Sequence, residues 1–165
     1  MKEFKEIIKN FSHDRVSKYY ILCLERIVDP KYSNKKEEIE YQMKCLDERM
    51  KEISNSGESI ARAKIGVMRF FGYQVGIVNG KTKEYRRQVI KRVITGYIPP
   101  FAHEGYIGWW GETRSPRRVQ AVKSFLKDKI NSPQHTNHDE AIQDWQDDLN
   151  WLENEEQTIL SEEFS

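Results

Sequence analysis

The sequence has no long apolar run and only two cysteines. Its 165 residues include no stretch of roughly 18 apolar residues, the length needed to cross a bilayer. Residues 1–6 (MKEFKE) do not resemble the start of a signal peptide. Cys23 and Cys45 fall on two predicted antiparallel helices, about six residues or ~9 Å out of level, which exceeds disulfide reach. These absences exclude a membrane protein and a disulfide miniprotein, and we expect a cytoplasmic protein with reduced thiols.

The common signatures of catalysis and cofactor binding are also absent. The sequence has no H-E-x-x-H, Walker loop, dinucleotide fingerprint or G-x-S-x-G elbow. His135 and His138 stand near Asp139 and Glu140, but a structural zinc site takes four ligands, usually with closely spaced cysteines. We therefore expect no metal, no cofactor and no catalytic residue, and we lean away from an enzyme.

Charge is distributed in blocks, although the net charge is only +1. Residues 1–61 carry 12 basic and 12 acidic side chains, and residues 62–129 carry 15 basic and 4 acidic ones. Residues 130–165 carry 10 acidic side chains and no lysine or arginine. This asymmetry indicates either an acidic partner for the basic block, such as a nucleic acid, or pairing between the two blocks. We slightly favour internal pairing.

Apolar residues recur at helical spacing, which predicts an all-α protein of about six helices. Residues 1–56 are expected to form an N-terminal αα-hairpin, with the first long helix ending at Asp29-Pro30 because proline disfavours helical geometry in the preceding residue. The two facing stripes are Val16, Tyr20, Cys23 and Ile27, and Ile39, Met43, Leu46, Met50 and Ile53.

Residues 58–154 are expected to form a C-terminal helical unit, in one compact domain with the hairpin. Thr82 is a predicted N-cap of a helix to about residue 95, and Ser115-Pro116 begins a helix to about residue 130. Thr136 or Asn137 is expected to cap the last helix, and residues 155–165 to form a loose acidic tail. Residues 73–78 are predicted as a short extended segment, either a strand or an extended connection, followed by a turn at Asn79-Gly80. Residues 97–114 are predicted as a long, ordered, aromatic Gly/Pro loop.

Charged residues on apolar helix faces predict a buried ion pair. Arg86 shares a face with apolar residues of its helix, and Asp148 lies among those of the last helix. We expect Arg86 or Arg118 to pair with Asp148 or Glu112. The alternative is that the arginine extends its head group to water.

Aromatic and basic residues interleave between residues 62 and 123. Such a mixture can stack on bases and hold phosphates, although an aromatic Gly/Pro loop is more often part of a core. The candidate face consists of Arg62, Lys64, Lys83, Arg87, Lys91, Trp109, Trp110, Arg114, Arg117 and Lys123.

About half of the chain, from Gly72 to Leu152, resembles a pattern of small uncharacterised bacterial proteins. The residues that carry it are Gly72-Tyr73, Val75-Gly76, Arg86 or Arg87, Gly96, Pro99-Pro100, Trp110-Gly111-Glu112, Ser115, Arg118, Trp145, Asp148-Leu149 and Trp151-Leu152. The resemblance implies that residues 58–153 form one structural unit, and it implies no activity.

Three functions follow from these patterns. The favoured one is a non-enzymatic interaction or regulatory protein that binds a partner protein, or itself, through the N-terminal hairpin. The second is a nucleic-acid-associated protein that uses the basic block, with the acidic C-terminal segment modulating binding. The third is an enzyme with a small site among His103, Glu104 and Glu112 in the 97–114 loop.

Overall fold

The computed structural model describes residues 2–56, 66–98, 108–132, 134 and 138–162, and every regular element in these ranges is a helix. The predicted all-α class is therefore confirmed. In chain order the elements are α1 (Lys2–Ile8), α2 (His13–Val28), the 3-10 helix η1 (Pro30–Lys35), α3 (Lys36–Asn55), α4 (Gly66–Phe70), α5 (Lys83–Thr95), α7 (Pro116–Asn131) and α8 (Asp139–Ser161).

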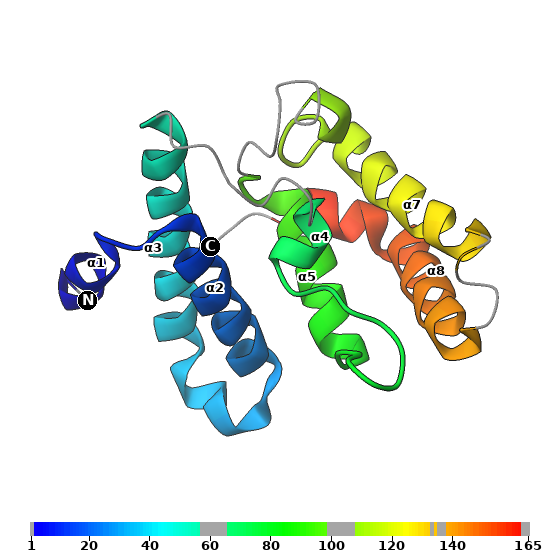
Figure 1. The fold of residues 1–165 in the computed structure, drawn as a ribbon, viewed down its shortest axis with the longest axis horizontal. Helices are drawn as coiled ribbons and strands as arrows, with labels where there is room; N and C mark the ends of the chain where they lie inside the picture. The colour runs from blue at the N-terminus through cyan, green and yellow to red at the C-terminus, as the bar shows by residue number, and fades with distance from the viewer. Residues whose placement is uncertain (1, 57–65, 99–107, 133, 135–137, 163–165) are drawn as a thin grey trace.

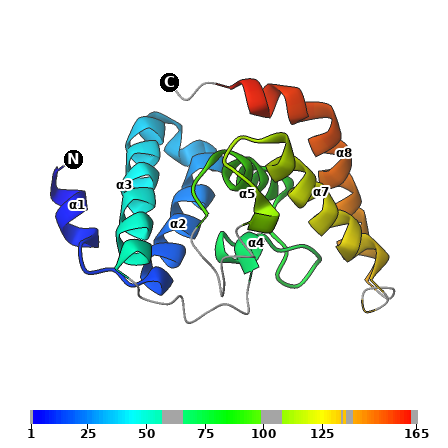
Figure 2. The same ribbon diagram turned by 90° about the horizontal axis from the view of Figure 1, so that it is seen from above.

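The N-terminal hairpin is present and consists of α2 and α3 joined by η1. Helix α2 ends before Pro30, and the Asp29 carboxylate accepts a hydrogen bond from the Lys31 amide at 2.9 Å. Helix α1 packs on the outer side of α3 (Figure 2). Cys23 and Cys45 are both buried and free, which agrees with the expectation of two reduced thiols.

Helix α5 lies between the α2–α3 pair and the α7–α8 pair (Figure 1). Its apolar residues Val89, Ile90, Val93 and Ile94 are fully buried and join both pairs in one continuous core. A helix with neighbours on both sides must be apolar over a wide arc, which explains why four of its thirteen residues are inaccessible to water.

The predicted starts of two helices are correct. Thr82 caps α5 by accepting a hydrogen bond from the Tyr85 amide at 3.2 Å. Ser115 caps α7 in the same way, accepting from the Arg118 amide at 3.1 Å, and Pro116 occupies the first turn. A side-chain oxygen at this position satisfies an amide that the helix itself leaves without an acceptor.

The predicted extended segment at residues 73–78 is not a strand. It belongs to the α4–α5 loop (residues 71–82), which makes bends and a turn. A strand needs a partner to accept its backbone hydrogen bonds, and the described residues contain no strand that could pair with it. Side chains of α5 and α8 form hydrogen bonds with backbone groups of the loop instead.

The predicted loose tail is also corrected, because α8 continues through residue 155 to Ser161. Ile159 is fully buried, so the last turns of α8 contribute to the core. The predicted aromatic loop lies partly outside the described residues, as do the predicted caps Thr136 and Asn137.

Candidate binding site

A buried ion-pair network anchors the α4–α5 loop. Arg86 of α5 donates from Nε to Asp148 of α8 at 2.6 Å, and its other nitrogens reach Asp144 at 3.1 Å and the Lys81 carbonyl at 2.9 Å. The Tyr73 hydroxyl donates to the same Asp148 carboxylate at 2.7 Å. The two ends of the loop are therefore attached to one charged centre between α5 and α8.

Burial controls the electrostatics of this network. The side chains of Arg86 and Asp148 are 4% and 0% exposed, so water screens their attraction very little. Burial raises the pKa of Asp148, whereas the hydrogen bonds from Arg86 and Tyr73 favour the carboxylate and lower it. Burial also raises the pKa of Tyr73, and the negative charge of Asp148 adds to that effect. Tyr73 therefore remains a neutral donor at neutral pH.

Two glycines close the loop and hold an apolar tip in solvent. Gly76 has a φ of +89° and donates its amide to the Asp144 carboxylate at 3.0 Å. A Cβ atom at Gly80 would lie 1.8 Å from the Gly76 carbonyl oxygen, so the backbone can close here only with glycine. Between them, Ile77 and Val78 are 78% and 90% exposed. We call these two residues the loop tip.

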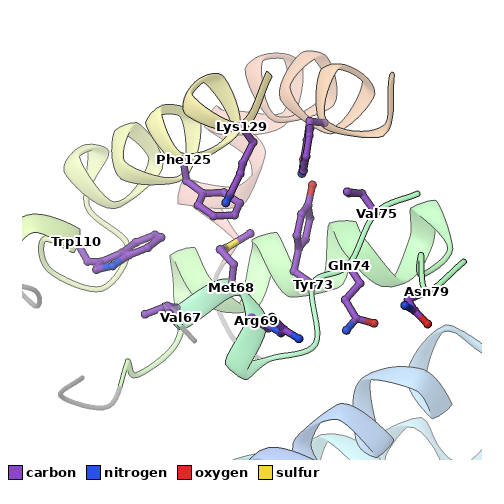
Figure 3. Close-up of a pocket in the computed structure, with 12 residues that line it drawn as sticks. Val67, Met68, Arg69, Tyr73, Gln74, Val75, Asn79, Trp110, Phe125 and Lys129 are labelled. Carbon is purple, nitrogen blue, oxygen red and sulfur yellow. The ribbon is translucent and has the colours of Figure 1, made fainter. Parts of the chain in front are cut away.

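A cleft of about 450 Å³ opens beside the loop, and we call it the aromatic cleft (Figure 3). Its walls come from α4, residues 73–79, α7 and α8, and four aromatic residues line it: Tyr73, Trp110, Phe125 and Trp145. The Tyr73 and Phe125 rings lie 6.0 Å apart and nearly perpendicular, at 82°. Clefts of roughly 300–1,000 Å³ with mainly apolar walls are typical of small-molecule sites.

The charged residues that line the aromatic cleft are both cations. Arg69 belongs to α4 and Lys129 to α7, so the two positive charges come from different helices. The Lys129 ammonium lies 5.6 Å from the centroid of the Phe125 ring. Gln74 and Asn79 add side-chain amides to the lining. The cleft thus combines flat apolar surfaces with positive charge and neutral hydrogen-bonding groups.

A second, more open hollow of about 810 Å³ lies between the end of α3 and the start of α7. Arg118 borders it, but its guanidinium donates to the backbone carbonyls of Val93, Gly96 and Gly111. Burial, together with the nearby charge of Arg92, lowers the pKa of Arg118 to about 10. These hydrogen bonds thus hold α7 against the end of α5.

Acidic side chains of α8 pair with the basic block. Glu162 lies 3.3 Å from Lys91, and Glu156 lies 2.5 Å from Lys123. Helix α8 also supplies both carboxylates that bind Arg86. The positive and negative blocks of the sequence are thus brought together inside one molecule.

The predicted basic and aromatic face is divided among different environments. Lys91 and Lys123 form the ion pairs just described, and the Arg87 guanidinium lies 5.2 Å from the Trp151 ring centroid. Trp110 is buried in the aromatic cleft. Lys83, Trp109 and Arg117 are exposed, Arg114 donates to the Glu162 carbonyl, and Arg62 and Lys64 lie outside the described residues.

The structure forms one of the ion pairs that the sequence allowed. Arg86 contacts Asp148, whereas Arg118 binds carbonyl groups and the side chain of Glu112 is exposed. Of the acid–base residues considered for an enzyme, His103 and Glu104 lie outside the described residues.

Sequence reasoning missed the residues that distinguish this site. Arg69 and Lys129 carried no pattern that set them apart from other surface cations. Ile77 and Val78 stand in an apolar run before Asn79-Gly80, a pattern that predicts a strand or an extended connection followed by a turn. The flanking Gly76 and Gly80 were the signal for a closed loop.

No helix among the described residues is long and apolar enough to cross a membrane. The same part of the chain holds no group of three or more potential metal ligands. Comparison of the chain with protein-family models, with curated proteins and with solved structures found no match. The geometry of the chain itself is therefore the basis for inferring its function.

Proposed function

We propose that this chain is a non-enzymatic interaction protein that binds a partner protein through the loop tip. The observation that carries the proposal is the exposure of Ile77 and Val78, 78% and 90%, on a loop anchored by buried charges. Apolar side chains held rigidly in solvent lose little conformational entropy when a partner covers them. They therefore suit recognition better than the flexible charged residues that surround them.

The expected partner presents an apolar pocket that accepts two adjacent β-branched side chains. The tip segment, residues 77–80, is uncharged in a chain that is 32% charged, so it matches an apolar surface. The apolar stripes of the α2–α3 hairpin are mostly buried within the fold, which leaves little of them for docking. The loop tip thus replaces the hairpin as the surface that we assign to partner binding.

The experiment places a photo-crosslinking amino acid at position 78 in cells of the source organism. A matched protein carries it at Gln120, an exposed position on α7. A partner recovered only from position 78 is then purified and titrated with the parent protein and with an Ile77→Asp, Val78→Asp variant. We expect the double substitution to weaken binding by about 100-fold, since two buried anchor residues are lost.

An Ile7→Asp variant is the matched control, because Ile7 is an exposed isoleucine on α1. It should bind the partner as the parent does. Equal crosslinking from positions 78 and 120, crosslinks only to other copies of this chain, or equal loss of binding in the Ile7 variant would each overturn the proposal.

A further inference from the structure

We propose that the aromatic cleft binds a small planar aromatic molecule that carries an anionic group. This ligand site is separate from the loop tip and does not depend on the proposed partner. The proposal rests on the cleft's shape, its ring surfaces and the sign of its charges.

The walls of the cleft offer ring faces and edges with fixed orientation. Tyr73 is held through its hydroxyl by Asp148, so its ring cannot turn away. Phe125 stands nearly perpendicular to it, and Trp110 and Trp145 are 2% and 6% exposed, which confines their side chains. These three buried rings give the lining a fixed apolar shape, and the half-buried Phe125 ring can stack on, or meet the edge of, another aromatic ring with little loss of entropy. The geometry thus selects a flat, unsaturated ligand.

The charges select an anion. Arg69 and Lys129 come from two different helices, and no carboxylate belongs to the lining of this cleft, which is made entirely of described residues. Neither cation has a carboxylate within ion-pair distance among the described residues, whereas Lys81, Lys91 and Lys123 each do. A bound anion would supply the counter-charge, and its hydrogen bonds to these cations would be charge-assisted.

The neutral polar groups fit a ring with heteroatoms. Gln74 and Asn79 line the cleft with amides that both donate and accept hydrogen bonds. A ring with heteroatoms can exchange hydrogen bonds with these amides, whereas a purely hydrocarbon ring cannot. Two sources share the required chemistry: aromatic carboxylates such as indole-3-carboxylate, and nucleoside monophosphates such as AMP.

The test is titration calorimetry on the full chain, with tryptophan fluorescence as a second readout because Trp110 and Trp145 line the cleft. The probes are indole-3-carboxylate and AMP, their uncharged counterparts indole and adenosine, and the non-aromatic anions acetate and phosphate. We expect one aromatic anion to bind with a Kd in the micromolar range, at least about tenfold tighter than its uncharged counterpart. Which anion binds identifies the source.

A Lys129→Gln substitution should weaken that binding by about tenfold or more, because it removes one charge-assisted contact. Lys127→Gln, on the same helix at an exposed position, is the matched control and should bind as the parent does. The Ile77→Asp, Val78→Asp variant should also retain the ligand, which separates this proposal from partner docking. No binding of either aromatic anion at millimolar concentration, equal binding of the uncharged counterpart, or equal effects of the two lysine substitutions would overturn it.

Discussion

A guanidinium group carries its positive charge into a protein interior only where acceptors surround it. Arg86 and Arg92 of α5 meet this condition with carboxylates. Arg86 binds Asp148 on one side of the helix, and Arg92 binds Asp47 of α3 at 2.5 Å on the other. The Arg92 guanidinium also lies over the rings of Tyr20 and Phe71. Two arginines six residues apart thus attach α5 to both of its neighbouring helix pairs.

Among the residues that the structure describes, Arg118 meets the same condition with backbone carbonyls alone. Two of its acceptors, the carbonyls of Val93 and Gly96, lie at the C-terminal end of α5. The partial negative charge at a helix C-terminus favours a cation there. The lowered pKa of Arg118 follows because burial is opposed by dipoles rather than by a full negative charge.

Replacing Asp148 with alanine is expected to destabilise the protein strongly. The substitution leaves Arg86 buried with part of its counter-charge removed and leaves the Tyr73 hydroxyl without its acceptor. Loss of one partner of a buried pair costs about 3–5 kcal/mol. Urea unfolding followed by circular dichroism measures the change. Glu153→Ala, at an exposed position on the same helix, should unfold as the parent does. A parent-like Asp148→Ala would show that the pair contributes little.

Cys23 is expected to make the protein less stable in alkali. Burial raises the pKa of its thiol from 9.0 to about 11. Below pH 9 the thiol is protonated in both states. Between pH 9 and about 11 the unfolded chain releases the proton and the folded chain keeps it, so stability falls as the pH rises. The free energy of unfolding falls by roughly 3 kcal/mol over this pH range.

Urea midpoints of the parent and of Cys23→Ala, measured from pH 7.5 to 10.5, test this expectation. The variant loses buried volume at every pH, so the informative quantity is the slope of stability against pH. The slope should be shallower in the variant. Identical slopes would assign the alkaline loss to other groups, such as Tyr20 and Tyr85, whose pKa values burial also raises.

At the scale of elements, the sequence identified the helices better than the segments that connect them. Apolar spacing and the caps Thr82 and Ser115 place α5 and α7 correctly, because both signals act within a few residues. The pattern leaves a strand and an extended connection open for residues 73–78, since the closed shape of the α4–α5 loop depends on Asp144 and Asp148, about 70 residues further along the chain. Local pattern reveals that Arg86 and Asp148 require partners, but the choice between the candidate pairs depends on packing.

The end of α8 shows a similar limit and gives a further prediction. Between residues 156 and 163 the sequence is polar except for Ile159 and Leu160, which is too little periodicity to indicate a helix on its own. Contact with the rest of the protein stabilises the last turns of α8, because Ile159 is fully buried. Ile159→Ala should therefore cost about 2–5 kcal/mol. Thr158→Ala, at the exposed neighbouring position, is the control.

Thermal and urea unfolding of the two α8 variants give the comparison. If Ile159→Ala and Thr158→Ala unfolded together with the parent, the last turns of α8 would not belong to the cooperative core. The same experiment separates packing from charge, because neither substitution touches Glu156 or Glu162.

Across the whole molecule, three cations of the basic block pair with carboxylates of the acidic block. Helix α8 carries no lysine or arginine, and it lies against α5 and α7, which carry much of the basic block. Carboxylates of α8 and of its C-cap residue Glu162 bind Arg86, Lys91 and Lys123. These cations are therefore paired with carboxylates of the same chain, and they would otherwise attract phosphate groups.

The parent protein is therefore expected to bind nucleic acid weakly. At physiological salt, non-specific binding typically has a Kd between about 10⁻⁴ and 10⁻⁶ M, and we expect a Kd at or above the weak end of that range. Fluorescence anisotropy with labelled single- and double-stranded DNA and RNA, across a salt series, gives the measurement.

A Glu156→Gln, Glu162→Gln variant tests whether α8 is the cause. It keeps the whole chain but removes the charges that face Lys123 and Lys91. If α8 masks these two lysines, binding at low salt should tighten, and the slope of log K against log salt should steepen by up to about 2, because each freed cation releases roughly one counterion. Micromolar binding by the parent at physiological salt would instead mean that exposed cations such as Lys83 and Arg117 suffice, and would favour the nucleic-acid function.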